Sequence, residues 1–479
     1  MSVSTSLESL PLQQIITMVA GDSVKKRKGT FFSSVFALLT TCMGAGTLSL
    51  PYAFMKGGLL FSLVIFVLVM VTAIVIGYML LESKHLVESM SGKSIINSYA
   101  DLGEYSFGII GKFVMLMVVT VFLVLCLIAY MIFARDQLEG ILDFIVNKSC
   151  GHDSDCVAQW IALLGNYAVL LCISFLPLFP LLLLRQFTPL KYTNTLSIIA
   201  IVLLTLVIVI RSVSSLRNGE ATDRGLIKNW PTDMVSGLTC VSYCSLTFLC
   251  HFNLFAIERE LRHVSFRKMQ AIIVVSMTFA FIVYLLVSIF GYLQFRNCTD
   301  SDVIKGYPSN DGLIVAARIA LFFTLLFSYP VLMNPCRDAV NGIILLFLRN
   351  CTRSRWFAFK EEDQLVEPLT SNVLLMSKTM WFMETWILFA VTFVSASNIT
   401  DVSKVWDFVG SIGGCLILYV LPPIAFLKIR YQHYRHLHGH SRRWWRTPKD
   451  MAAFCLTLIG LILLAVENYQ AVIDVKVKS

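Results

Sequence analysis

The sequence is dominated by apolar runs that are long enough to cross a lipid bilayer. Eleven such runs lie between Thr30 and Val466, and about 20 apolar residues suffice for one helix to span the hydrocarbon core. Since hydrocarbon offers no partner to a free backbone N–H or C=O, each run has to be helical. The composition agrees, with 14% charged residues and a mean hydropathy of +0.73, against roughly 25% charged residues in soluble chains. The sequence therefore predicts an all-α polytopic membrane protein.

The runs divide the chain into one membrane domain with two short ends. We expect an N-terminal tail over residues 1–29, a transmembrane domain over residues 30–466 and a C-terminal tail over residues 467–479. The eleven predicted spans are Thr30–Phe54, Leu59–Leu81, Phe113–Ala134, Trp160–Leu184, Thr195–Ile210, Met234–Ile257, Ala271–Phe295, Gly312–Met333, Leu374–Ser395, Val405–Ile429 and Met451–Val466.

Basic residues are distributed unevenly between the two predicted sides of the membrane. If the N-terminus is inside, the inside segments hold 24 Lys and Arg residues and the outside segments hold 12. Cytoplasmic loops carry the excess of positive charge in membrane proteins. The bias therefore predicts a cytoplasmic N-terminus and an extracellular or lumenal C-terminus.

Glycosylation sequons give a second indication of orientation. Those at Asn147, Asn297 and Asn398 fall in predicted outside loops, whereas the one at Asn350 falls inside. The sequence thus predicts a glycoprotein that passes through the secretory pathway. We favour the plasma membrane as its destination, and an endolysosomal membrane is the alternative.

Most of the 13 cysteines lie inside apolar runs, where Cys is usually a small packing residue. The predicted outside loops are the exception, and there a disulfide is expected. It should join two of the three outside cysteines, namely Cys150, Cys156 and Cys298. The His and Asp residues between Cys150 and Cys156 do not match a closed metal site, so no metal is expected.

The first span contains residues that a regular helix avoids. Its sequence from Thr41 to Phe54 is T-C-M-G-A-G-T-L-S-L-P-Y-A-F, with Gly44 and Gly46 followed by Pro51. Glycine lets a ligand approach the backbone closely, and proline removes a hydrogen-bond donor. An interruption at mid-membrane depth creates free backbone groups that can bind a carboxylate, an ammonium group or a cation. The alternative is a close contact between helices through small residues.

The sixth span has a second interruption. Its sequence C-S-L-T-F-L-C-H-F-N-L-F-A-I-E-R-E-L, from Cys244 to Leu261, gathers polar side chains and then becomes strongly charged. Spans one and six are five spans apart. Transporters built from two inverted five-helix repeats place their broken helices at these corresponding positions.

At this point the chain resembles a known family. The run M-G-A-G-T-L-S-L-P-Y-A-F is similar to the first-helix motif of the amino acid/auxin permease family, which includes sodium-coupled, proton-coupled and protist amino acid transporters. The resemblance continues in order through four further segments, namely Ala129–Leu138, Cys250–Leu261, Ser328–Arg337 and Trp406–Gly414. It implies a LeuT-type 5+5 inverted repeat with helices 1 and 6 broken. It also implies symport of amino acids by alternating access.

The resemblance places the substrate beside the two breaks. The backbone of span one would hold the carboxylate and ammonium groups, while span three would supply a covering Tyr and span six the side-chain pocket. The implied residues are Gly44, Ala45, Gly46, Thr47, Tyr130, Ser245 and Phe248. Tyr130 and Phe248 could equally be packed core residues.

The coupling ion is either a proton or sodium. Sodium sites of this fold use span-one carbonyls and span-eight hydroxyls, for which Thr324 and Ser328 are candidates. The sodium-coupled members carry an Asn four residues before the first glycine of the motif, where this chain has Thr40. That departure favours proton coupling.

Two ionisable residues inside the spans are further coupling candidates, because such residues are costly in hydrocarbon and usually functional. Glu384 in span nine could bind a proton or balance a cationic substrate. We favour a structural pairing of Glu384 with Arg318 in span eight. His251 near the inner end of span six could titrate near neutral pH, although a packed, satisfied histidine is the simpler interpretation.

Other classes of protein find less support. The sequence has no nucleophile elbow, P-loop or metal-ligand helix motif, so we expect neither an enzyme nor an ATP-driven pump, and no resident cofactor. No pore-loop filter indicates a channel. An amino-acid-sensing transceptor remains the second hypothesis. The expected partners are an amino acid and the lipid bilayer, not nucleic acid. The choice between neutral and cationic substrates stays open, as does the oligomeric state.

Overall fold

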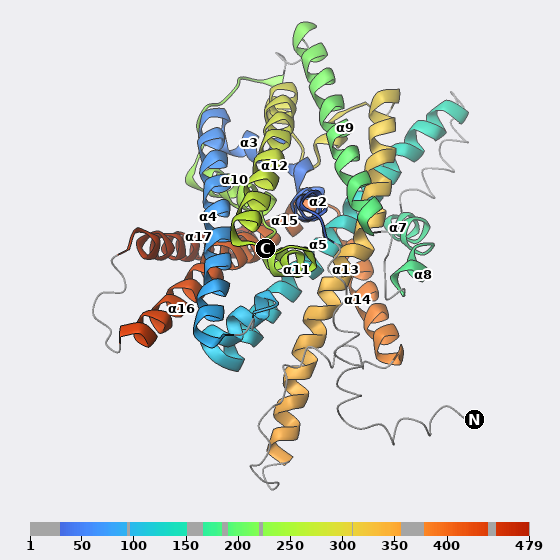
Figure 1. Ribbon diagram of the computed structural model, residues 1–479. Helices are drawn as coiled ribbons and strands as arrows, with labels where there is room; N and C mark the ends of the chain where they lie inside the picture. The colour runs from blue at the N-terminus through green and yellow to red at the C-terminus, as the bar shows by residue number, and fades with distance from the viewer. Residues whose placement is uncertain are drawn as a thin grey trace, which may run out of the picture.

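A computed structural model describes residues 29–92, 96–150, 166–183, 190–219, 224–308, 310–355, 378–438 and 447–478. Over these residues the regular elements are helices, joined by loops, apart from one isolated backbone bridge between Gly29 and Leu261. The predicted N-terminal tail up to residue 28 and the loop at residues 151–165 lie outside the described part. Long helices run through the molecule, with α4 beside α12 and α13 beside α9 (Figure 1).

Ten of the eleven predicted spans have a counterpart among the described residues. Nine helical segments are long and apolar enough to cross a membrane, and a bent helix pair makes a tenth. The segments are Leu59–Ser91, Tyr99–Cys150, Thr195–Arg217, Met234–Glu260, Phe266–Cys298, Gly312–Phe347, Met380–Asn398, Val402–Leu437 and Pro448–Val466, and the pair is Phe31–Cys42 with Gly46–Gly57. The remaining prediction, Trp160–Leu184, is only partly described.

The principal helices follow the predicted order. Their bounds are α4 (Leu59–Ser91), α5 (Tyr99–Cys150), α7 (Tyr167–Phe175), α8 (Phe179–Leu182), α9 (Leu190–Arg217), α12 (Phe266–Phe295), α13 (Gly312–Arg355), α14 (Lys378–Asn398), α15 (Val402–Val409), the π-helix η7 (Gly410–Val420), α16 (Leu421–His438) and α17 (Pro448–Lys478). Short 3-10 turns η4 (Arg296–Cys298) and η5 (Val303–Gly306) connect α12 to α13.

The first span is broken as predicted. Helix α2 (Phe31–Cys42) ends at the motif, a 3-10 turn η1 (Ala45–Ser49) follows, and α3 (Leu50–Gly57) continues the span. The two halves are bent by 52°. Pro51 stands in the first turn of α3, where the missing N–H would have had no helical partner anyway. Pro51 therefore starts the second half-helix, and Met43 and Gly44 form the break itself.

The sixth span is broken as well. Helix α10 (Met234–Thr247) ends at Phe248, a 3-10 turn η3 (His251–Asn253) follows, and α11 (Leu254–Glu260) completes the span. Both interruptions therefore lie at the corresponding positions that an inverted repeat requires.

Spans one, two, six and seven are tied together by polar contacts. His251 Nε2 lies 2.8 Å from the carbonyl oxygen of Ala73 in α4. Lys84 of α4 pairs with Glu258 of α11 at 2.9 Å. The carbonyl of Val35 in α2 accepts a 3.3 Å hydrogen bond from α12. We call these four spans the bundle.

Spans three and eight form the other half of the core. Helices α5 and α13 pack against each other along much of their length, and α14 packs on α5. In Figure 1, α13 crosses the molecule beside α9. The tie between α13 and α14 is a 2.8 Å hydrogen bond between the hydroxyls of Tyr329 and Thr392. The candidate site, at the two helix breaks, therefore lies between the bundle and α5.

We predict that Gly291 of α12 sets the distance between α12 and α3. A Cβ at this position would lie 2.6 Å from Pro51 Cγ, so Gly291→Val should separate the two helices. Overpacking of this kind costs about 1–3 kcal/mol, and the Tm of the purified protein in detergent should fall. The control is Gly312→Ala, where no atom lies within 4 Å of the added Cβ. Equal Tm values for both variants would contradict this packing.

Candidate functional site

The two helix breaks lie close to each other in the middle of the bundle. Helix ends leave backbone groups without helical partners, and the turns satisfy some of these locally. Thr47 donates its hydroxyl to the carbonyl of Gly44 at 3.0 Å. A Cβ added to Gly46 would lie 3.8 Å from Cγ2 of Thr247, which places η1 against the end of α10. The predicted residues of spans one and six are thus brought together.

Tyr130 of α5 covers the break in span one. Its hydroxyl lies so close to Gly44 that a Cβ at that position would overlap it. Tyr130 is 9% exposed. The span-three tyrosine therefore lies against the glycine motif, as predicted. Only a glycine at position 44 leaves room for the Tyr130 hydroxyl.

Tyr284 of α12 is a neighbour that we did not predict from the sequence. Its hydroxyl donates to the carbonyl of Thr247 at 3.2 Å. It also interacts with Thr47 and lies near Tyr130. A tyrosine in the middle of the apolar run of span seven was the available signal, because a buried hydroxyl needs a partner.

Ser245 and Phe248 have different surroundings. Ser245 donates to the carbonyl of Val241 at 2.7 Å and lies 3.3 Å from the hydroxyl of Tyr419. Phe248 is fully buried, with its ring 5.2 Å from that of Phe66 and 5.7 Å from that of Tyr284. Ser245 thus belongs to a chain of hydroxyls, whereas Phe248 supports the break by aromatic packing.

The coupling candidates in spans one and eight have hydrogen-bond partners within or beside their own helices. Thr40 donates to the carbonyl of Phe36 at 2.8 Å within α2. Thr324 donates to the carbonyl one turn before it in α13, and the hydroxyl of Ser328 lies 3.4 Å from that of Ser197 in α9. Among the described residues, neither span-eight hydroxyl makes a hydrogen bond to the break in span one.

The expected pairing of Glu384 with Arg318 is wrong. The guanidinium of Arg318 lies against Gly140 of α5 and donates to the carbonyl of Ile304 at 3.0 Å. Glu384 instead interacts with the side chain of Asn341 and with the charge of Arg337, both on α13. Helices α13 and α14 are antiparallel, and 19 residues separate the two arginines along α13, or about 28 Å of helix. The register of the two helices therefore selects Arg337.

His251 is buried in the bundle, with 1% of its surface exposed. Its Nε2 lies 2.8 Å from the carbonyl oxygen of Ala73. Because a carbonyl can only accept, Nε2 carries the proton. The histidine therefore fastens the break in span six to α4.

A segment between α12 and α13 closes over the other side of η1. We call residues 299–307 the cap. Its turn η5 contacts η1, and the side chains of Val303 and Ile304 are buried. The cap lies at the end of the molecule that the charge bias predicts to be outside. It would therefore separate the breaks from that side.

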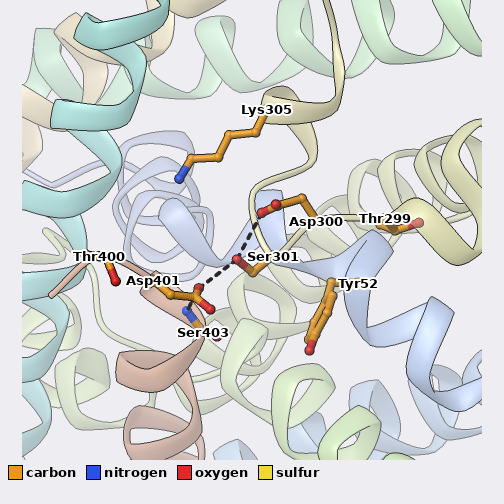
Figure 2. Close-up of a pocket in the computed structure, with 8 residues that line it drawn as sticks. All are labelled: Tyr52, Thr299, Asp300, Ser301, Lys305, Thr400, Asp401 and Ser403. Carbon is orange, nitrogen blue, oxygen red and sulfur yellow. Dashed lines mark hydrogen bonds between the residues drawn. The ribbon is translucent and has the colours of Figure 1, made fainter. Parts of the chain in front are cut away.

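A polar pocket of about 360 Å³ lies at the edge of the cap. It is lined by Tyr52 of α3, by the cap, by the turn between α14 and α15 and by the first turn of α15. The lining residues are Tyr52, Thr299, Asp300, Ser301, Lys305, Thr400, Asp401 and Ser403. Figure 2 shows Ser301 between Asp300 and Asp401, with both carboxylates accepting from its hydroxyl at 3.2 Å.

The cap is fastened to α5 by two polar contacts. Gln137 donates to Oδ2 of Asp302 at 2.9 Å, and Lys305 pairs with Asp136 at 2.8 Å. Asp302 is fully buried. Burial, together with the nearby carboxylate of Asp136, raises the pKa of Asp302 from 3.8 to about 7, against the opposing effect of Lys305. The cap therefore carries a carboxyl group that titrates near neutral pH.

One further outcome concerns the outside loops. Cys150 is disulfide-bonded, whereas Cys298 is free. The expected outside disulfide thus involves Cys150 and excludes Cys298. Among the described residues, no group of three or more His, Cys, Asp or Glu side chains could hold a metal ion.

Comparison with known proteins identifies the class. A family model described as transmembrane amino acid transporter protein matches residues 27–473. Since this match spans most of the 479 residues, the chain belongs to that family of amino acid transporters, and it is an integral multi-pass membrane protein.

The fold also has a counterpart among solved structures. The chain is similar to MhsT, known from a crystal structure in complex with L-phenylalanine, with 13% identical residues and a TM-score of 0.51. The alignment covers 92% of this chain and 99% of that chain. At this identity the likeness shows the fold alone. It is the LeuT-type fold that the family resemblance implied.

We predict that Gly44→Ala reduces amino acid uptake by about tenfold or more, because its methyl group would overlap the Tyr130 hydroxyl. An overpacking cost of about 1–3 kcal/mol corresponds to a change of that size. Gly46→Ala is the matched control, since its Cβ meets nothing closer than 3.8 Å. Adding Tyr130→Phe to Gly44→Ala should restore part of the uptake. Equal uptake by the two alanine variants would contradict the contact.

We also predict that the cap is held more firmly at pH 6 than at pH 8. A raised pKa means that the closed cap binds its proton more tightly than an exposed carboxyl does. The stabilisation is complete below pH 3.8 and is lost as the pH rises through about 7. Hydrogen exchange of the cap amides, corrected for intrinsic rates, should show more opening at pH 8. Asp302→Asn should remove this difference, and its persistence would contradict the assignment.

Proposed function

We propose that this protein is a secondary active transporter that moves neutral amino acids by alternating access, driven by protons and independent of sodium. The observation that carries the proposal is the pair of opposed helix breaks at Gly44 and Phe248, beside which buried hydroxyls gather. Unwound backbone at this depth is tolerated only where protein or a polar cavity covers it. In this fold class such breaks bind substrate.

The proposed substrate class follows from the side chains at the breaks. Hydroxyl groups reach this region from Thr47, Tyr130 and Tyr284, and the thiols of Cys42 and Cys250 interact across it. These groups are neutral. A zwitterionic amino acid brings its own paired charges, which backbone dipoles and hydroxyls can bind without a charged partner. Glu384 belongs to a different cluster, on α13 and α14.

Alternating access is supported by the way the contacts are divided. The bundle is joined internally by His251, Lys84 and Tyr284. The cap, in contrast, is fastened to α5 through Asp302 and Lys305. A bundle with its own internal ties can rock as a unit against α5 and α13. Release of the cap would then open the breaks to the predicted outer side.

Proton coupling is favoured over sodium coupling by the residues where sodium would bind. Thr40 replaces the Asn typical of sodium-coupled relatives, and the hydroxyls of Thr324 and Ser328 are directed to other partners. We place the protein in the plasma membrane with its N-terminus in the cytoplasm. The bias of basic residues and the three sequons in the predicted outside loops support this orientation.

Uptake by oocytes that express this chain tests the proposal. Radiolabelled L-alanine, L-glutamine, L-phenylalanine and L-arginine would be supplied at two external pH values, with sodium or with choline. We expect saturable uptake of neutral amino acids that rises at the acidic pH and persists in choline. Surface biotinylation controls for expression, and uninjected oocytes give the background. Absence of uptake from a surface-expressed protein would overturn the transport proposal and favour a transceptor.

A further inference from the structure

A cluster of buried polar side chains on α13 and α14 lies apart from the helix breaks. Residues Glu384, Thr385 and Leu388 are buried on one face of α14, at the spacing that faces a neighbouring helix. Glu384 is 8% exposed. Both of its carboxyl oxygens are buried and neither makes a hydrogen bond of good geometry, although the side chain of Asn341 is close enough to interact with the carboxyl group. The Oδ1 atom of Asn341, on a side chain that is 1% exposed, is likewise buried and without a partner.

Arg337 lies near these oxygens but donates its hydrogen bonds to other groups. Its Nη1 donates to the carbonyl of Leu182 at 2.9 Å and to the hydroxyl of Thr385 at 2.8 Å. Its Nη2 donates to Asn334, and the guanidinium lies 3.9 Å above the ring of Trp381. Arg337 therefore ties α8, α13 and α14 together. Among the described residues, no carboxylate lies within salt-bridge distance of it.

The buried oxygens of Glu384 and Asn341 can together bind one proton. A buried carboxylate without well-formed hydrogen bonds is strongly unfavourable, whereas the neutral acid avoids that cost. The acid also gains an O–H group, which the free Oδ1 of Asn341 can accept. A metal cation is disfavoured at the same oxygens, because the positive charge of Arg337 stands beside them. That charge is itself stabilised by three oxygen acceptors and an aromatic face.

We propose that Glu384 and Asn341 form a binding site for a proton, which competes with Arg337 for the Glu384 carboxylate. Proton binding forms one O–H bond on Glu384, and nothing else is released. When the proton leaves, the carboxylate attracts the guanidinium, which gives up its bonds to Leu182 and Thr385. Occupancy of the site thus controls the tie between α8, α13 and α14. That this proton drives transport rests on the function proposed above.

Few other charged groups interact with the Glu384 carboxyl. Arg337 and Asp338 of α13 interact with the Glu384 carboxyl, and the thiol of Cys336 lies near it. Asp338 itself is turned to the surface. Helices α5 and α7 also pack on α14, but no titratable side chain of their described residues interacts with Glu384. Asp338 is therefore a suitable control position.

Infrared spectroscopy of the purified protein tests the proton site without any substrate. The wild type at neutral pH should show a carbonyl-stretch band of a protonated carboxylic acid that is lost in Glu384→Gln. The control Asp338→Asn should retain it. Asp302 is unchanged in all three proteins, so its contribution cancels in the difference spectra. A spectrum of Glu384→Gln with the full wild-type band would overturn the proposal.

Transport into proteoliposomes tests the role of the proton, with the same four amino acids as probes. In the wild type, a pH gradient should drive accumulation of the preferred amino acid together with proton entry, reported by trapped pyranine. Glu384→Gln should keep amino acid exchange at equal concentrations but lose gradient-driven accumulation. Accumulation by this variant at the wild-type level would overturn the coupling role and leave the transporter proposal intact. If the wild type accumulates none of the probes, the transporter proposal itself fails, and the infrared result decides the proton site alone.

Discussion

The structure depends on one constraint, that backbone hydrogen-bonding groups must find partners inside hydrocarbon. Continuous helices satisfy this requirement with their own backbone hydrogen bonds, whereas the two broken spans need partners from other parts of the chain. At span one, Thr47 and Tyr130 cover the exposed turn around Gly44. At span six, Tyr284 donates to the carbonyl of Thr247, where α10 ends. A chain that keeps two interruptions facing each other must surround them with polar groups. Those groups and the open backbone make up the candidate binding site.

The same requirement explains how the rest of the molecule is organised. The broken spans cannot hold their shape alone, so α4 and α12 are fastened to them, at His251 for example. The remaining core, α5 and α13, carries the charges that hold the cap and α14. Asp136 and Gln137 fasten the cap at one end, and Arg337 joins three helices at the other. The contacts that hold the cap and the contacts of Arg337 thus lie at opposite ends of a packed interior. In alternating access, one set of contacts would break while the other set stays formed.

The sequence predicted the features that depend on local chemistry. Apolar length located the spans, and the glycines of M-G-A-G-T located the first break, because hydrocarbon tolerates such residues only at special positions. Register between distant helices was not predictable. Glu384 was expected beside Arg318, yet the antiparallel packing of α13 and α14 brings it to Arg337. The cap was missed for a similar reason, since a short polar loop gives no sign that Asp302 is buried.

The central claim is that the backbone at the two breaks binds the amino acid. The most direct measurement is an experimental structure of the full chain with its preferred amino acid bound. The account predicts ligand density between η1 and the segment around Phe248, with the carboxylate and ammonium groups within hydrogen-bond distance of backbone atoms and Tyr130 closed over them. Density confined to the polar pocket beside the cap, with the breaks still covered by protein alone, would contradict it.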